Sequence, residues 1–322
     1  MSGRSVRGLV VGAAALLALG GGCAGTPASP GPAVPRAADD SLVIYHAGSL
    51  AAPLRILADS FARQTGTKVR LASGGSVVQA RLAMEPDQAP DVLALADYAI
   101  IPRLLLPAHA DWYAGFARNA MVLLFAERST GAGEIRSDNW MDVLLRPGVR
   151  AGHSDPALDP AGYRARLVFA LAERYYGRPG LAAALDRAVP VVSAPPGRNM
   201  LDQLKAGELD YVVAYRTTAR TEGLRAVELP HEIDLSDPGL AADYGRVRIR
   251  VARPGTDSSE IAGEPILYGV TVPRAARHRA AGEGFVRLLL SPTGRAALEQ
   301  AGFVVPARPT FEGRVPASIR PQ

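Results

Sequence analysis

Four short segments of the sequence place small or hydroxyl residues directly before a stretch that we expect to be helical. They are HAGSL at residues 46–50, SGGSV at 73–77, DPAGY at 159–163 and PPGRNM at 195–200. The first N–H groups of a helix have no partner within the helix, and the helix dipole gives that end partial positive charge. Such ends can bind an anion without a basic side chain, so the segments predict an anion-binding site.

Three hydroxyl groups would add hydrogen-bond donors to such a site. Ser49 and Ser76 stand in the first two segments, and Tyr215 ends the apolar run VVAY. A serine before a helix is more often only an N-cap, and a glycine there is more often a turn, so one segment alone indicates little. The first two segments fall in one half of the folded chain and the last two in the other. If each half forms a lobe, the helix starts favour donors that converge on one cleft between the lobes.

Short apolar runs alternate with amphipathic segments from residue 41 onward. The expected strands are LVIYHA, VRLAS, DVLALA, MVLLFA, VRAGHS, VPVVSA, LDYVVAY and PILYGVTVP, and helices are expected from about Leu50 and Val77 and over 163–176, 200–206, 282–290 and 292–301. This alternation is typical of βαβ units, which predict a parallel sheet with helices on both faces. The fold class is therefore expected to be α/β.

The alternation of expected strands and helices occurs twice along the chain. Two doubly wound α/β lobes joined by crossing strands are therefore predicted, with a ligand in the cleft between them. Lobe I is expected to comprise residues 41–126 and 266–322, and lobe II residues 127–265.

The N-terminal stretch has the features of an export signal. Two arginines precede the apolar run Leu9–Leu19, and small residues and the single cysteine, Cys23, follow it. The run is shorter than the roughly 20 residues of a membrane-spanning helix, so residues 1–23 are predicted to be a signal peptide. Cys23 is expected to become the lipid-modified first residue of a lipoprotein, with ordinary cleavage near Ala24 as the alternative.

The next stretch, AGTPASPGPAVPRAADD at residues 24–40, is rich in Pro, Ala and Gly and has no apolar periodicity. It is predicted to be a flexible, extended tether. The folded protein is therefore expected outside the cytoplasm, in the periplasm or at the cell surface, held to a membrane by the lipid.

The composition favours an ordinary folded protein and argues against nucleic-acid binding. The chain has 322 residues, is 48% hydrophobic and 21% charged, and carries a formal net charge of +5. Its arginines are dispersed, without a basic run and with little aromatic interleaving. A dispersed basic surface usually only keeps a protein soluble.

Longer motifs carry a resemblance to a known family. In this order along the chain stand AGSL, the GGS turn, DVLALADYAIIPRLLLP, ADWYAGFARN, DPAGYR, GELDYVVAYRTTA and VELPHEIDLSDP. From Leu42 to Phe303 the chain resembles the molybdate/tungstate-binding proteins of ABC importers, and in particular their tungstate-type branch. The resemblance implies a type II periplasmic-binding fold, no enzyme activity, no cofactor, a monomer, and delivery of the oxyanion to an ABC permease.

The resemblance also implies a set of ligand-binding residues. Ser49 and Ser76 would bind the anion from the first lobe, and the Tyr215 hydroxyl would close the site. Backbone N–H groups of Ala161 and near Gly197 would bind it from the second lobe. The hydroxyl residues agree with those found from the helix starts.

The chain departs from the tungstate-type branch at one position. In that branch two carboxylates can complete a six-coordinate metal, one in the D-P-x-G-Y motif and one directly before the tyrosine. Here the first is Asp159, but the second position is Ala214. A single carboxylate cannot complete this shell and would repel a dianion, so tetrahedral binding is favoured. Asp159 would be a metal ligand only if the metal is more than four-coordinate, and otherwise would cap its helix.

Two other functions stay open from the sequence. Sulfate or phosphate would suit the same donors, because helix ends and hydroxyls bind any tetrahedral oxyanion of suitable size. A secreted hydrolase acting through Ser49 or Ser76 is less favoured, since His46 lies in HAGSL and the G-x-S-x-G nucleophile elbow is absent.

The remaining polar candidates are expected to be structural. They are His153, His231 and Asp234, which have no metal-binding spacing and are assigned to the surface or to turns, and Asp97 and Tyr98.

Overall fold

The computed structural model describes residues 40–193, 198–253 and 256–320. The expected signal segment with Cys23, nearly all of the expected tether, and Gly197 lie outside the described residues. Within the described part of the chain, no helix is long and apolar enough to cross a membrane.

The first sheet has six strands in the order β12-β4-β11-β3-β1-β2. Their bounds are β1 Leu42–Ala47, β2 Val69–Gly74, β3 Val92–Leu95, β4 Trp112–Arg118, β11 Leu267–Thr271 and β12 Thr310–Gly313. Strand β1 pairs in parallel with β2 and β3, whereas β11 pairs antiparallel with β3 and β4, and β12 pairs antiparallel with β4. The order β2-β1-β3-β11-β4 places a strand from late in the chain at the centre of the sheet.

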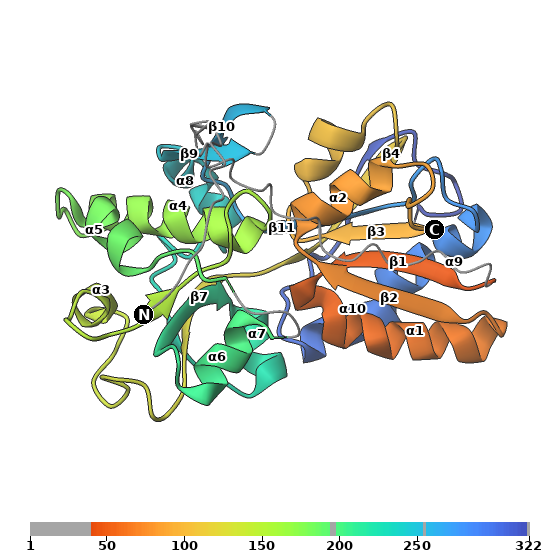
Figure 1. Cartoon of the computed structure of the whole chain (residues 1–322). Helices are drawn as coiled ribbons and strands as arrows, with labels where there is room; N and C mark the ends of the chain where they lie inside the picture. The colour runs from red at the N-terminus through yellow and green to blue at the C-terminus, as the bar shows by residue number, and fades with distance from the viewer. Residues whose placement is uncertain (1–39, 194–197, 254–255, 321–322) are drawn as a thin grey trace, which may run out of the picture. The chain divides into compact units, whose positions relative to one another are not determined.

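Helices cover both faces of this sheet (Figure 1). They are η1 Gly48–Leu50 running into α1 Ala51–Thr65, α2 Ser76–Met84, the π-helix η2 Ile101–Leu105, α9 Arg279–Leu290 and α10 Pro292–Gln300. Alternate residues of a strand face opposite sides. Val92 accordingly belongs to the core under α1, α9 and α10, whereas Leu93 packs with α2 and η2.

The second sheet has four strands in the order β6-β7-β5-β8. The bounds in this region are β5 Met121–Phe125, α3 Trp140–Leu144, β6 Ala151–Gly152, α4 Pro160–Tyr175, α5 Leu181–Ala188, α6 Met200–Ala206, β7 Tyr211–Tyr215, α7 Arg216–Glu222 and β8 Arg225–Glu228. Helix α4 packs on one face with Leu123 and Val213, and α6 and α7 pack on the other with Val122 and Val212. A short helical segment, η3 Pro238–Leu240 with α8 Ala241–Tyr244, leads to the hairpin of β9 Arg248–Arg253 and β10 Thr256–Ala262.

The chain crosses between the two sheets at two places. Strand β4 leads into β5 through Asn119 and Ala120, and residues 263–266 lead from β10 into β11. We call residues 40–118 and 267–320 lobe I and residues 121–262 lobe II. Because β5 pairs with β7 and β8, the first crossing lies ahead of the boundary expected near residue 126.

The predicted α/β class is confirmed, but the expectation of parallel sheets is wrong in part. Strands β4 and β11 run antiparallel to their neighbours because the chain leaves lobe I along one and returns along the other. The run VPVVSA forms no strand among its described residues and contributes only an isolated bridge between Val191 and His153. The run VRAGHS is reduced to the two residues of β6.

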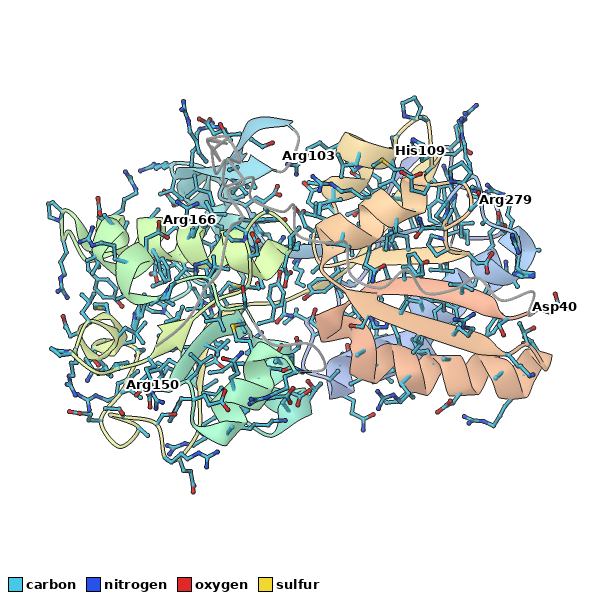
Figure 2. The ribbon with its side chains drawn as sticks, viewed as in Figure 1. Asp40, Arg103, His109, Arg150, Arg166 and Arg279 are labelled. Carbon is cyan, nitrogen blue, oxygen red and sulfur yellow. The ribbon has the colours of Figure 1, made fainter. Side chains whose placement is uncertain are left out.

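The basic side chains are dispersed, as the sequence indicates. Figure 2 labels four arginines from separate parts of the chain that do not gather in one patch, namely Arg103, Arg150, Arg166 and Arg279.

Candidate functional site

A cleft of about 840 Å³ lies where strand ends and helix starts of both lobes meet. Its walls come from the carboxyl ends of β1, β2, β3 and β7 and from the segments that follow them. In open α/β sheets ligands bind at this edge. Among the lining residues are Ala47, Gly48, Ser49, Ser73, Gly75 and Ala96 of lobe I, and Ser154, Asp159, Ala161, Ala214, Tyr215 and Thr218 of lobe II.

The two helix starts of lobe I at this cleft have no side-chain cap. Neither η1, which continues into α1, nor α2 receives a capping bond from the residue before it, since these residues are Ala47 and Gly75. The N–H of Val77 donates to the Leu158 carbonyl across the lobes at 3.3 Å. The helix starts of lobe I therefore have no side-chain cap, although the Val77 N–H already has a backbone partner.

The two serines are placed differently. Ser49 lines the cleft, and its Oγ lies 2.8 Å from the Tyr268 hydroxyl. Ser76 is fully buried just behind the lining, and its Oγ accepts the N–H of Ala96 at 3.0 Å. That bond occupies an acceptor position of Ser76 and leaves its own proton for donation.

The helix starts of lobe II are capped, which corrects the expectation that PPGRNM exposes free N–H groups. Asn199 accepts the N–H groups of Leu201 and Asp202 at 2.8 and 3.0 Å, and the Asp202 carboxylate in turn accepts the Asn199 N–H. This is a complete capping box, in which a side chain satisfies the donors that an anion would need. Gly197, expected to contribute here, lies outside the described residues.

Asp159 caps helix α4, the role weighed for it from the sequence. Its Oδ1 accepts the N–H of Ala161 at 3.1 Å, so this backbone donor already has a partner. The carboxylate lines the cleft, and its burial raises the pKa of Asp159. An anion at Ala161 would have to share or replace this bond.

Tyr215 is held by a buried arginine that the sequence analysis missed. Arg164 is fully buried, and its Nη1 donates to the Tyr215 hydroxyl at 2.8 Å and to the Ala96 carbonyl at 2.6 Å. A guanidinium has no acceptor, so the tyrosine oxygen must accept and its proton remains available to the cleft. Burial raises the pKa of Tyr215 well above its usual range, which keeps this hydroxyl a donor.

Asp97 of lobe I contacts two residues of helix α4 in lobe II, in line with the structural role expected for it. The Tyr163 hydroxyl donates to its Oδ2, and Arg164 Nη2 lies 3.7 Å from its Oδ1. Its Oδ1 also accepts the N–H of Ala99 at 3.0 Å. The buried carboxylate and the buried guanidinium therefore compensate each other across the two lobes.

The comparisons with known proteins identify the family. A profile of the bacterial extracellular solute-binding proteins matches residues 42–304. The chain belongs to this family. As a solute-binding protein it is a binding protein and not an enzyme.

Two curated relatives align with this solute-binding protein over most of its length. An uncharacterised solute-binding protein of Methanoculleus marisnigri is 39% identical, over 83% of this chain and 82% of the relative. The molybdate/tungstate-binding protein WtpA of Pyrococcus abyssi is 33% identical, over 87% of this chain and 88% of the relative.

Solved structures confirm the predicted type II periplasmic-binding fold. The periplasmic molybdate-binding protein of Azotobacter vinelandii matches with a TM-score of 0.54 at 19% identity, covering 83% of this chain and 100% of that one. The sulfate-binding protein SubI of Mycobacterium tuberculosis matches with a TM-score of 0.59 at 18% identity, covering 82% and 86%. At these identities the likeness concerns the fold alone.

Two histidines weighed in the sequence analysis, His46 and His231, have structural partners in the solute-binding protein. His46 is buried and its Nδ1 lies 2.8 Å from the Ala47 carbonyl, while burial lowers its pKa. His231 and Asp234 lie in a turn, with Nδ1 and Oδ2 3.1 Å apart. Within the described ranges no three His, Cys, Asp or Glu side chains form a group that could hold a metal ion.

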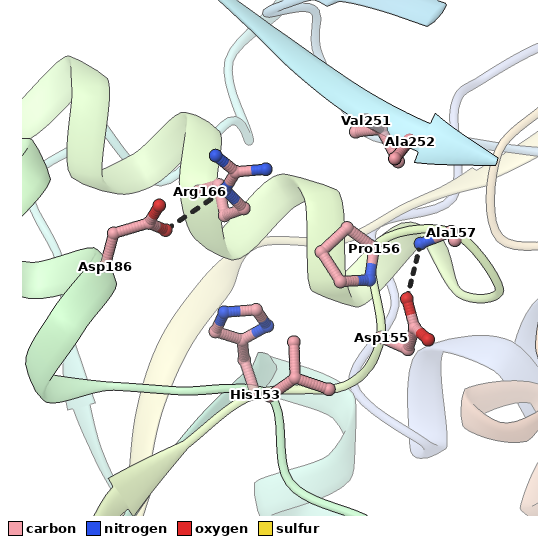
Figure 3. A pocket seen from close by; sticks show the side chains of 9 residues that line it. His153, Asp155, Pro156, Ala157, Arg166, Asp186, Val251 and Ala252 are labelled. Carbon is pink, nitrogen blue, oxygen red and sulfur yellow. Dashed lines mark hydrogen bonds and ion pairs between the residues drawn. The ribbon is translucent and has the colours of Figure 1, made fainter. Parts of the chain in front are cut away.

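His153 is buried, which corrects its assignment to the surface or a turn. It lines a second cavity of about 390 Å³ (Figure 3). Burial lowers the pKa of His153, and the cation in this cavity, Arg166, is 3.0 Å from Asp186 and also donates to the Arg250 carbonyl. A neutral imidazole and a paired guanidinium do not favour an anion here.

Proposed function

We propose that this protein captures molybdate or tungstate in the interlobe cleft and delivers it to the permease of an ABC importer. The observation that supports this most is the set of hydroxyl and backbone donors at one cleft, which is lined by Ser49, by Tyr215 and by the residues at the uncapped helix starts of lobe I. The alignment with the molybdate/tungstate-binding protein WtpA over most of both chains supports the choice of ligand. The protein would act as a monomer and need no cofactor.

The proposed ligand set is the one expected from the sequence. Ser49, Ser76 and Tyr215 would donate their hydroxyl protons to the oxyanion. Backbone N–H groups of Ala161 and Gly197 would complete the site, with Ala161 shared between the anion and its present cap acceptor. Hydrogen bonds to a charged group are stronger than neutral ones, so a few such donors suffice for tight binding.

The N-terminal region is proposed to export and anchor the protein. Residues 1–23 would form a signal peptide, Cys23 would carry a lipid in the membrane, and residues 24–40 would tether the two lobes in the periplasm or at the cell surface. Metabolic labelling with a fatty-acid analogue tests the anchor. Equal labelling of the wild type and Cys23→Ala would exclude it.

Thermal unfolding of the two-lobed domain with different oxyanions tests the proposed function. Molybdate and tungstate are expected to raise the melting temperature by several degrees, because a ligand that binds only the folded state at a thousandfold excess over its Kd adds about 4 kcal/mol. Sulfate at the same concentration is expected to give a much smaller shift.

The matched oxyanions serve as the control for that experiment. Equal shifts with sulfate or phosphate would favour a receptor for another tetrahedral oxyanion, the alternative that the donors alone leave open. No shift with any of them would contradict the proposal, and calorimetry would then be expected to show no binding.

Replacing Asp159 by asparagine is expected to leave the affinity for molybdate unchanged or to raise it. Asparagine caps a helix about as well as aspartate, so α4 should keep its cap while a negative charge beside the dianion is removed. Calorimetry measures the affinity, and X-ray absorption of the tungstate complex should report four oxygen neighbours. More than four neighbours, together with loss of binding in Asp159→Asn, would make Asp159 a metal ligand.

A further inference from the structure

A chain of buried polar groups connects the cleft with the first crossing between the lobes. Ser49 Oγ lies 2.8 Å from the Tyr268 hydroxyl, which accepts the Nδ2 group of Asn119 at 3.1 Å. Asn119 Nδ2 also donates to Thr217 Oγ1 at 2.8 Å. The chain therefore includes Ser49 and Tyr268 of lobe I, the crossing residue Asn119, and Thr217 at the start of α7 in lobe II.

The direction of each bond in this chain follows from the Asn119 amide. Its Oδ1 faces the backbone N–H of Ala120 at 3.0 Å and that of Thr217 at 3.4 Å. Backbone N–H groups only donate, so the carbonyl oxygen of the amide must point toward them and the amino group toward Tyr268. Tyr268 thus receives a hydrogen bond and has one proton left to give.

Ser49 is the partner that can take the Tyr268 proton. Tyr268 is fully buried, and an unpaired buried donor would cost the full desolvation of that group. With Tyr268 donating, the Ser49 oxygen accepts, and the Ser49 proton is directed to an acceptor in the cleft that Ser49 lines. The reverse direction would turn the Ser49 proton away from the cleft and leave the phenol proton without a partner.

We propose that Tyr268 and Asn119 are positioning residues for oxyanion capture. Their hydrogen bonds, which start at the first crossing between the lobes, orient the Ser49 hydroxyl so that it donates its proton into the cleft. This inference rests on the proposed function, because the Ser49 proton needs an anionic acceptor. Neither residue would touch the anion, and both would act through Ser49. The crossing between the lobes would thereby be part of the hydrogen-bond network that recognises the ligand.

A double-mutant cycle with calorimetry and molybdate tests this proposal. Tyr268→Phe keeps the ring, which packs edge-on against Phe303 with centroids 5.1 Å apart, and removes only the hydroxyl. We expect it to weaken molybdate binding about three- to tenfold, the range for one lost hydrogen bond. In the Ser49→Ala background the same change should have no further effect, because Tyr268 acts through Ser49.

Tyr211→Phe is the matched control. Tyr211 is a buried residue of β7 whose hydroxyl donates to the Thr130 carbonyl at 2.6 Å, away from the cleft lining. Its affinity for molybdate should equal that of the wild type. Thermal unfolding of each variant confirms that the domain is folded, and if Tyr268→Phe does not fold, Asn119→Ala takes its place in the same cycle.

Each outcome decides the proposal. Equal losses from Tyr268→Phe with and without Ser49→Ala would overturn it, since the effect would then not pass through Ser49. Unchanged affinity in Tyr268→Phe would overturn it as well while the proposed function stands. A wild type that binds no molybdate would instead remove the proposed function, and this inference with it.

Discussion

Replacement of Arg164 by methionine is expected to lower the free energy of unfolding by about 3 to 5 kcal/mol and to abolish oxyanion binding. Breaking a buried ion pair from one side leaves the other charge buried without compensation. Here that charge is Asp97, which is 2% exposed and would keep its hydrogen bonds from Tyr163 and Ala99. In the described part of the chain, the other cation paired with it is the partly exposed Arg103, at 3.9 Å. Methionine fills much of the same volume, so the loss reports the charge and its hydrogen bonds more than a cavity.

Loss of binding should accompany the loss of stability, because Arg164 connects both lobes at the cleft. It donates to the Ala96 carbonyl of lobe I and to the Tyr215 hydroxyl of lobe II. Without it, Tyr215 loses the donor that fixes its orientation. The double variant Arg164→Met with Asp97→Asn should therefore recover part of the stability, since no buried charge remains, while affinity for molybdate stays low.

Arg166→Met on the same helix is the matched control. Arg166 pairs with Asp186 at 3.0 Å, and both side chains are about a third exposed. Such pairs contribute about 0 to 1 kcal/mol, so chemical denaturation should show a small change and calorimetry should show wild-type affinity. Equal destabilisation by the two substitutions would mean that the interlobe ion pair does not stabilise the fold as described.

Local patterns along the sequence were sufficient for the elements that have one apolar face and clear ends. The helix expected over residues 200–206 is found with those bounds, since Asn199 begins it and Gly207, in the left-handed region, ends it. Strand β4 could not be predicted in the same way. Almost every residue of WYAGFAR is buried, so no alternation of apolar and polar residues marks it.

Close packing explains the unusual composition of β4. A Cβ added at Gly115 would lie 2.5 Å from Thr310 Oγ1 and 2.7 Å from Leu267 Cδ2, on the neighbouring strands β12 and β11. The glycine is therefore required by residues distant in sequence. Only the assembled sheet shows why a glycine stands in this strand.

The residues of the cleft could be predicted only where a local sequence pattern marks them. Ser49 and Tyr215 are recognisable because a hydroxyl beside a helix start has a local signature, and both line the cleft. Asn119 and Tyr268 are separated by 149 residues and have no such signature. Arg164 follows DPAGY in a helix, where an arginine usually faces solvent, and only the fold shows that it is buried.

The capping of α6 in lobe II could have been predicted from the sequence. The presence of Asn199 and Asp202 three residues apart fits a capping box, a pattern that could have been found from the sequence. Had it been recognised, the N–H groups of α6 would not have been expected to be free. The missed signal was thus the side chain that satisfies the helix start.

Substitution of Gly75 by alanine is expected to weaken molybdate binding by about five- to a hundredfold while each lobe stays folded. A Cβ at this position would lie 2.5 Å from the Leu158 carbonyl oxygen and 3.1 Å from its carbon, across the cleft. Both are backbone atoms that cannot rotate away, and overpacking of this kind costs about 1 to 3 kcal/mol. The added methyl group should therefore oppose the close approach of the lobes.

The backbone of Gly75 itself does not require glycine. Its φ of −64° and ψ of 134° are ordinary extended values that alanine adopts without strain, so α2 and lobe I should form normally. The apo protein should accordingly unfold close to the wild-type temperature.

Gly133→Ala is the matched control for Gly75→Ala. A Cβ at Gly133 would meet nothing within 4 Å, so its affinity for molybdate should equal that of the wild type. Calorimetry measures the affinities, and small-angle scattering with and without molybdate measures closure, which should be smaller in Gly75→Ala. In the structure Leu158 lies close to the start of α2, where its carbonyl accepts the Val77 N–H at 3.3 Å. If this close approach is part of the anion-bound arrangement, the methyl group at residue 75 should impair binding. Wild-type affinity in Gly75→Ala would show that the oxyanion is held with the lobes further apart.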